Sequence, residues 1–234
     1  SDLYQMFLFS LIYLTVLTFS LYISWSSTLK SCMVFLQHTL NEYNRQAFEN
    51  MAHTDSHTGL NNRRCFQYLA QQLVQQNFDQ PVPMSLLVFV VDHFKQINDR
   101  YGHDIGDQVL QTIALNTHSE MRQHDILARY GGEEFIAFLP ETSLDEALKV
   151  AERLRHKIEN IVIDLDSQHR FSFSISIGAA ILESCETDLM TLIKQADIAL
   201  YQATANGRNR VEAYDPDLEQ SLAGEMQNWQ VKPA

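Results

Sequence analysis

The first hydrophobic feature of the chain is an uncharged run from Met6 to Trp25. About twenty helical residues span roughly 30 Å, the thickness of a bilayer core. Tyr4 and Tyr22 are of the type that lies at membrane interfaces. The run therefore predicts a transmembrane helix within residues 1–25. The alternative is a buried core helix, because Ser and Thr dilute the run. A cleaved signal peptide is disfavoured, because no basic residue precedes it.

Residues 26–54 have a different pattern, in which apolar residues recur at alternating spacings of four and three. This is the seam of a helical coiled-coil connector, and it predicts a parallel homodimer. The alternative is one amphipathic helix packed on its own domain. The seam consists of Leu29, Met33, Leu36, Leu40, Tyr43 and Ala47.

From Asp55 onward, short apolar runs alternate with turns. Ser85–Val91 is typical of a buried strand. The runs 126–130 and 135–139 flank Gly131-Gly132, which predicts a hairpin whose glycines take positive φ angles. Residues 171–177 alternate as a half-buried strand does. Helical spacing covers 65–76, 94–100, 106–121, 144–158 and 189–205, and a short edge strand is expected over 211–214.

This order predicts an α/β fold, a ferredoxin-like sandwich over residues 55–214, followed by a polar tail over residues 215–234. The net charge of -12 excludes a nucleic-acid-binding surface, which needs a basic patch. The three cysteines, Cys32, Cys65 and Cys185, have no metal-binding or redox spacing, which favours a reducing compartment. Because the first residue is Ser1, we expect further sequence upstream.

Carboxylates cluster at three places: Asp92 at the end of a strand, Asp107 with its acidic neighbours, and Glu133-Glu134 after the glycine pair. Strand ends and hairpin tips can meet at one edge of a sheet. A pair of carboxylates there suits Mg²⁺, which proteins bind through one or two carboxylates plus substrate phosphates. Each cluster alone is equally consistent with solvated surface.

Taken together, several segments resemble the GGDEF family of diguanylate cyclases over roughly residues 55–211. The resemblance implies a cyclase or palm-like fold in which two GTP molecules, one on each subunit of a homodimer, condense to cyclic di-GMP with Mg²⁺ or Mn²⁺. It implies a membrane-anchored protein of the bacterial inner membrane with a cytoplasmic GGDEF domain, an orientation that Lys30 and Arg45 after the uncharged run also favour. The segments are 55–64, 92–99, 101–107, 128–135, 176–178, 196–201 and 207–211.

The resemblance also assigns roles to residues. Glu133, beside Glu134, would hold the metal and help to activate the attacking hydroxyl, and the Val91 carbonyl would face the same metal. The glycines Gly131 and Gly132 allow backbone N–H groups to approach a phosphate. Guanine would contact Asn98, His103 and Asp107, and phosphates would contact Lys95 and Arg208.

Arg122 and Asp125, shortly before the glycine pair, resemble the inhibitory product-binding motif of the family. Arg153 on the following helix would be the second arginine of that site, because an arginine fork pairs with phosphate and stacks on guanine. The alternative is a surface ion pair of little energetic weight.

The resemblance breaks at three positions. Val90 stands where the family has a metal-binding aspartate, and Asp92 is the nearest candidate to replace it. Thr204 replaces a lysine that meets phosphate, and His57 replaces a leucine. Two functions follow: a diguanylate cyclase with product inhibition, or a catalytically weak or silent domain that acts as a cyclic di-GMP receptor or dimerisation partner. A third, weaker interpretation is a structural dimerisation module that binds neither nucleotide.

Overall fold

The computed structural model divides into two compact units, residues 1–51 and residues 52–234, which are considered separately. It describes residues 2–49, 53–76, 82–165, 170–182 and 188–217. Most of the expected tail, residues 215–234, therefore lies outside the described residues.

The first unit is one continuous helix, α1 (Asp2–Glu49), so the two expected N-terminal segments are not separated by a break. Side chains of residues 2–10 and 41–49 are not described, and the predicted membrane span begins among them. Within the described part of the chain, no helix is sufficiently long and apolar to cross a membrane. The seam residues Leu29, Met33 and Leu36 are exposed on the single chain.

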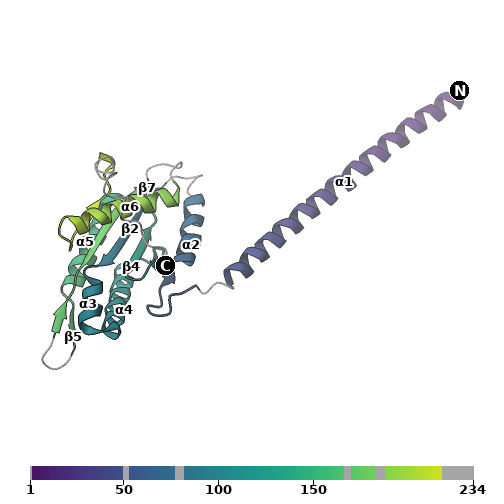
Figure 1. The fold of residues 1–234 in the computed structure, drawn as a ribbon. Helices are drawn as coiled ribbons and strands as arrows, with labels where there is room; N and C mark the ends of the chain where they lie inside the picture. The colour runs from purple at the N-terminus through teal and green to yellow at the C-terminus, as the bar shows by residue number, and fades with distance from the viewer. Residues whose placement is uncertain (1, 50–52, 77–81, 166–169, 183–187, 218–234) are drawn as a thin grey trace. The chain divides into compact units, whose positions relative to one another are not determined.

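A six-stranded mixed sheet forms the centre of the second unit, in the order β1-β3-β4-β2-β7-β8 (Figure 1). The antiparallel strands β3, β4, β2 and β7 are its middle, and β1 and β8 add parallel edges. The strands are β1 (Asn61–Asn62), β2 (Met84–Val91), β3 (Ile126–Arg129), β4 (Glu134–Leu139), β7 (Ile175–Leu182) and β8 (Val211–Ala213).

Helices cover both faces of this sheet, because successive residues of β2 point to opposite sides and are all apolar between Leu86 and Val91. One core contains Leu87, Phe89 and Val91, and the other contains Leu86 and Val88. The first face carries α3 (Phe94–Tyr101), α4 (His103–Glu120) and α5 (Leu144–Glu159); the second carries α2 (Arg63–Gln76) and α6 (Leu189–Ala205).

Gly178 of β7 sets how closely α6 approaches the sheet. A Cβ atom at this position would lie 2.2 Å from both the Ala196 carbonyl oxygen and the Leu200 nitrogen. Any larger residue would push the helix away from the sheet. The residues of α6 that contribute to the cavity described below therefore owe their position partly to this glycine.

The predicted α/β class and all five predicted helices of the second unit are confirmed. The sandwich prediction was incomplete, because the domain has three layers. The strand predicted over 171–177 is two strands, β6 (Arg170–Ser172) and β7, and β6 pairs with β5 (Val162–Asp164), which was not predicted. This small hairpin lies beside α3, where the rings of Phe171 and Tyr101 stack at 4.7 Å (Figure 1).

Candidate functional site

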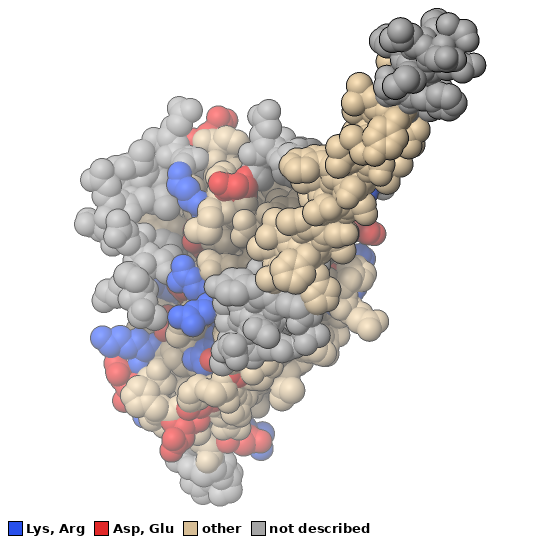
Figure 2. Space-filling view, turned by 90° about the vertical axis from the view of Figure 1, so that its right-hand side faces the viewer, with Lys and Arg blue, Asp and Glu red and all other residues tan. Residues whose placement is uncertain are grey.

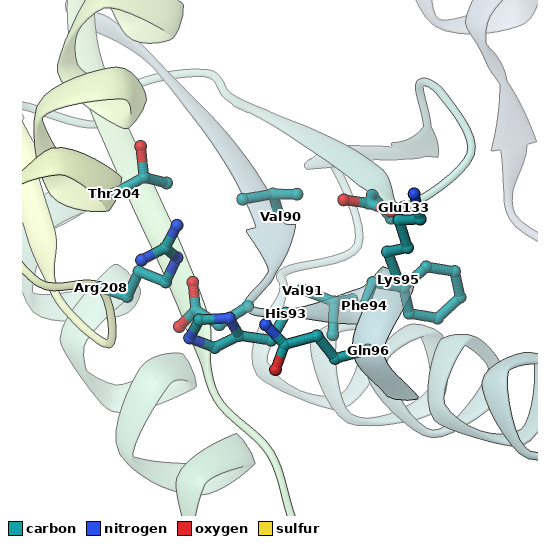
Figure 3. A pocket seen from close by; sticks show the side chains of 10 residues that line it. Val90, Val91, His93, Phe94, Lys95, Gln96, Glu133, Thr204 and Arg208 are labelled. Carbon is teal, nitrogen blue, oxygen red and sulfur yellow. The ribbon is translucent and has the colours of Figure 1, made fainter. Parts of the chain in front are cut away.

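A cavity of about 370 Å³ opens where β2 ends, and we call its lining the hairpin edge. Figure 3 shows Val90 in the middle, with Glu133 and Lys95 on one side and Arg208 on the other. Thus β2, the β3–β4 hairpin, α3 and the loop after α6 converge here. The sequence predicted only that strand ends and the hairpin tip meet at one edge of the sheet. The lining consists of Val90, Val91, Asp92, His93, Phe94, Lys95, Gln96, Glu133, Thr204 and Arg208.

The register of the sheet explains why position 90 matters. Val90 pairs with Glu134 of β4 on one side and with Ser176 of β7 on the other. Residues paired directly across strands point to the same face. A carboxylate at position 90 would therefore share a face with Glu134, whereas the valine contributes only apolar surface there.

The glycine pair does not have the conformation that we expected. Neither Gly131 nor Gly132 has a left-handed φ angle; among the described residues, the glycines that do are Gly59, Gly102 and Gly207. Gly131 is instead required for space, because a Cβ atom there would lie 2.8 Å from the Glu134 carboxylate. The prediction failed because the connection between the strands spans four residues, longer than the two-residue turn that needs positive φ.

Arg129 fixes the position of this hairpin. Its guanidinium donates to the Gly132 carbonyl at 2.6 Å and to the Asp55 carboxylate at 3.0 Å. The turn at the start of the domain is thereby joined to the hairpin that carries Glu133. This arrangement gives Asp55, the first residue of the recognised segments, a structural role.

Three partly buried carboxylates, Glu133, Glu134 and Asp197, lie at or close to the β3–β4 hairpin. Burial raises the pKa of Glu133, and the neighbouring Glu134 raises it further. Burial also raises the pKa of Glu134, although Arg63 opposes the rise. Behind them on α6, burial and the charge of Glu134 raise the pKa of Asp197 to about 7. A cation at this edge would relieve the repulsion.

Asp92, the expected substitute for the missing ligand, is already engaged. Its carboxylate accepts hydrogen bonds at 2.6 Å from each of the Ser174 and Ser176 hydroxyls. It also accepts one at 3.0 Å from the Asn209 backbone N–H. The side chain is buried. These bonds argue against the metal-ligand role and indicate that Asp92 holds β7 and the loop after α6 against the end of β2.

That loop carries Arg208 in an unusual conformation. Gly207, Arg208 and Asn209 are consecutive residues with positive φ angles. Asn209 keeps the loop in place, because its side chain donates to Glu159 at 2.6 Å and accepts from Arg155 at 2.9 Å. The backbone strain is thus supported by contacts on both sides, and it turns Arg208 toward the cavity (Figure 3).

The hairpin edge contains oxygen atoms of the kind that Mg²⁺ prefers. Mg²⁺ usually keeps several waters and is bound by one or two protein carboxylates together with substrate phosphates. Glu133 supplies one such carboxylate, and the Val91 backbone lies directly across from it, with a 3.4 Å contact between the Val91 nitrogen and the Glu133 carbonyl oxygen. Within the described residues no group of three or more His, Cys, Asp or Glu side chains is arranged to hold a metal. The residues fit a metal that is shared with a nucleotide.

A second cavity of about 520 Å³ adjoins the first and is called the base cavity. Asn98, His103 and Asp107 line it, together with Lys95 and Glu133. The Asn98 Oδ1 atom is buried and has no hydrogen-bond partner among the described residues. An unpaired buried acceptor is costly and is ready to accept from a ligand. The predicted guanine-binding residues therefore line one cavity beside the hairpin edge.

The space for Asn98 depends on Gly106, which follows in α4. A Cβ atom on Gly106 would lie only 1.9 Å from Asn98 Oδ1. Because the clash is with this unpaired acceptor, any side chain at position 106 would force the Asn98 side chain to move.

The predicted product-binding residues lie in what we call the α4–α5 corner, which also includes Glu120 and Lys157. The Arg122 N–H donates to Asp125 Oδ2 at 2.6 Å, and this bond closes a tight turn. Arg153 donates to the Glu120 carboxylate and, at 3.2 Å, to the Glu120 carbonyl. Lys157 binds the same carboxylate at 2.8 Å. Hydrogen bonds from Lys157 and Arg153 lower the pKa of Glu120.

Positive and negative side chains are mixed over the face of the molecule that Figure 2 draws. The face drawn in Figure 2 carries Lys and Arg interspersed with Asp and Glu, and the described middle of α1 is almost uncharged.

Sequence reasoning did not identify His93, Glu120 or Asp197 as relevant to these sites. His93 has a φ angle of 58° at the start of α3 and lines the cavity. A histidine between a strand and a helix gives no signal of such a conformation. Asp197 lies in one of the segments that suggested the family, but its burial beside Glu134 depends on how α6 packs.

Residues 52–210 match the model of a protein family described as diguanylate cyclase, GGDEF domain. Two curated relatives are similar to this chain. The uncharacterized protein YhcK of Bacillus subtilis is 43% identical over 161 residues, which are 68% of this chain and 45% of YhcK. The diguanylate cyclase DgcM of Escherichia coli is 40% identical over 183 residues, which are 77% of this chain and 43% of DgcM. The chain thus spans less than half the length of these relatives.

Among solved structures, the coiled coil and GGDEF domain of DgcB from Caulobacter crescentus, in complex with c-di-GMP, is similar with a TM-score of 0.67 and 27% sequence identity. The similarity covers 81% of this chain and 99% of that one.

Proposed function

Because the chain belongs to the GGDEF family of diguanylate cyclase domains, we propose that it condenses two GTP molecules into cyclic di-GMP and releases two pyrophosphates. The observation that carries the proposal is the position of Glu133. Its half-buried carboxylate, with a raised pKa, lies between the base cavity and the hairpin edge, whose lining includes Lys95 and Arg208. A triphosphate with its base in the base cavity would extend past this carboxylate.

In the proposed reaction, the 3′-hydroxyl oxygen of one GTP attacks the α-phosphorus of the GTP on the other subunit, and the bond to pyrophosphate breaks. Lys95 and Arg208 bind phosphate oxygens and stabilise the charge that develops. Glu133 lies at the reacting phosphate and assists loss of the hydroxyl proton, with Glu134 as its neighbour. A bound Mg²⁺ or Mn²⁺, held by Glu133 and the Val91 carbonyl, would neutralise phosphate charge.

The dimer geometry supplies most of the catalysis in this proposal. Each subunit holds one nucleotide, so the two reacting groups meet only when two domains face each other. The exposed seam on α1 supports dimerisation, because Leu29, Met33, Leu36 and Leu40 present a heptad stripe without a partner among the described residues. The similar DgcB structure contains a coiled coil beside its GGDEF domain.

The direct test is incubation of the purified chain with GTP and Mg²⁺, followed by chromatographic separation of nucleotides. We expect cyclic di-GMP and pyrophosphate to form in a ratio of about one to two. Absence of product under conditions in which the protein is folded and dimeric would refute the proposal.

A second function is favoured by Val90 and Thr204. Both line the hairpin edge, and neither supplies the carboxylate or the cation that the family places there. The α4–α5 corner nevertheless has both arginines and the Asp125 turn. A silent domain would bind cyclic di-GMP at Arg122, Asp125 and Arg153 without making it, and would act as a receptor or as the dimerisation partner of another cyclase. Product binding without synthesis would establish this function.

We also propose attachment to the bacterial inner membrane through residues 6–25, with the GGDEF domain in the cytoplasm. The proposal rests on the uncharged run in the sequence. Membrane fractionation of cells expressing the chain, and of cells expressing it with Leu11 and Leu14 changed to Asp, tests it. Recovery of both forms in the soluble fraction would contradict the proposal.

A further inference from the structure

His57 has no task in the proposed reaction, although its side chain lies beside Asp107, one of the predicted guanine-binding residues. Its Nδ1 atom lies 3.5 Å from Oδ2 of Asp107. Asp107 lines the base cavity. The imidazole therefore makes a polar contact with a carboxylate that faces the base, and a leucine at position 57 could not make it.

The backbone around His57 is held in place from two directions. Its carbonyl oxygen accepts a hydrogen bond at 3.2 Å from Gln111, which lies one turn after Asp107 on α4. Two residues before His57, Asp55 binds Arg129 of β3. Position 57 is thus fixed against both the helix that carries Asp107 and the strand that leads to the hairpin.

The orientation of Asp107 matters because of the chemistry of guanine. The Watson–Crick edge of guanine presents the N1–H and the 2-amino group side by side. A carboxylate can accept from both only when its plane faces that edge. The Asp107 side chain is 45% exposed, so a neighbour is needed to restrict its rotation. Hypoxanthine lacks the 2-amino group and depends less on this orientation.

We propose that His57 is a positioning residue for base recognition, whose imidazole N–H holds the Asp107 carboxylate in the orientation that accepts both guanine donors. His57 thereby raises the selectivity of the base cavity for guanine over hypoxanthine. This inference rests on the proposed nucleotide site.

The test is isothermal titration of the full chain with GDP and with inosine diphosphate, neither of which carries a pyrophosphate leaving group. We expect His57→Leu to weaken GDP binding by about threefold to tenfold, the cost of ordering one side chain on binding. Binding of inosine diphosphate should weaken less, so the preference for GDP should narrow. His118→Leu, an exposed histidine later on α4, is the matched control and should change neither affinity.

Two amide variants distinguish positioning from general packing. An asparagine places its amide nitrogen near the position of the imidazole Nδ1, whereas a glutamine places its amide nitrogen near Nε2. We therefore expect His57→Asn to retain GDP affinity and His57→Gln to lose it. In an Asp107→Asn background, His57→Leu should have no further effect, because the group that it positions is gone.

The inference is overturned if His57→Leu keeps both the affinity and the preference for GDP, or if His57→Asn loses as much as His57→Leu. It is also overturned if the wild-type chain does not bind GDP. Cyclic di-GMP synthesis is measured separately. Absence of synthesis, combined with GDP binding that depends on His57, would refute the proposed reaction and support the inference.

Discussion

The hairpin edge and the α4–α5 corner both combine carboxylates with basic side chains, but they balance charge in opposite ways. At the corner, Glu120 is already bound by Arg153 and Lys157, and these hydrogen bonds lower its pKa. At the hairpin edge, burial raises the pKa values of Glu133 and Glu134. The negative charge of Glu133 is thus disfavoured by its surroundings. That of Glu120 is stabilised by two basic side chains, and one of them, Arg153, would have to leave Glu120 to bind a ligand.

The largest effect is expected from a substitution at the hairpin edge that abolishes synthesis but leaves product binding at the α4–α5 corner unchanged. Glu133→Gln removes the charge that is needed for the metal and the proton, so we expect cyclic di-GMP synthesis to fall by about a hundredfold or more. Binding of cyclic di-GMP, measured by calorimetry, should not change. Glu141→Gln, at an exposed turn residue after β4, is the control. Synthesis within threefold of the wild type would show that Glu133 is not the catalytic carboxylate.

Substitutions of the arginines at the α4–α5 corner should instead affect product binding and leave synthesis unchanged. We expect Arg122→Ala or Arg153→Ala to weaken cyclic di-GMP binding by about tenfold to a hundredfold, because each loses a charge-assisted hydrogen bond. Initial rates of synthesis at low product should be unchanged. Arg170→Ala removes an exposed arginine that pairs with Asp164 and serves as the control. Equal weakening in the control would indicate a nonspecific charge effect.

Restoring the missing carboxylate should make the hairpin edge more like an ordinary metal site. Val90→Asp places a carboxylate on the face of Glu134, and we expect synthesis to rise by about tenfold, with a lower Mg²⁺ requirement. Val90→Asn has the same shape but is a weaker ligand, and should give little gain. An equal rise in both variants would attribute the effect to polarity alone.

The raised pKa of Asp197 should also affect the stability of the fold. Asp197 keeps its proton in the folded chain up to a pH of about 7, but loses it near 3.8 when unfolded. The folded state therefore binds more protons between these values, and the free energy of unfolding falls as pH rises from about 4 to about 7. Asp197→Asn should remove this decline and, at about 1.4 kcal/mol per pKa unit, be more stable at pH 8 by about 4 kcal/mol, with no gain at pH 3. Denaturant unfolding at both pH values measures it, and an equal change at both would contradict the assignment.

The smallest effect is predicted for removing the charge of Glu120 at the α4–α5 corner. Glu120→Gln loses ion pairs that are partly exposed, so we expect the free energy of unfolding at pH 7 to fall by about 0.5 kcal/mol. The loss should disappear as pH falls through the lowered pKa of Glu120. Because Arg153 is released, affinity for cyclic di-GMP should rise by about threefold. Glu152→Gln, which removes a partner of Arg155, is the control. A rise in both variants would refute a specific role for Glu120.

The sequence predicted the helices of the second unit because their amphipathic spacing agrees with the layers that they form. It could not predict β5, a strand of three residues that exists only by pairing with β6. The site residues were found through their order along the chain, and Asn98, Asp107 and Glu133 do line adjoining cavities. The role of Asp92 was missed, because its three hydrogen bonds come from residues more than eighty positions away. Only the folded chain brings these donors together.

The pairing of Gly106 with Asn98 has a consequence for how this domain can be altered by drift or by design. Asn98 Oδ1 can occupy its position in the base cavity because residue 106 has no side chain. A single methyl group at position 106 would lie 1.9 Å from this oxygen. We expect an alanine there to move the Asn98 side chain while every polar and charged group of the cavity is still present. A mutant library that varies only polar and charged positions would leave out position 106, although a side chain there alters the shape of the base cavity.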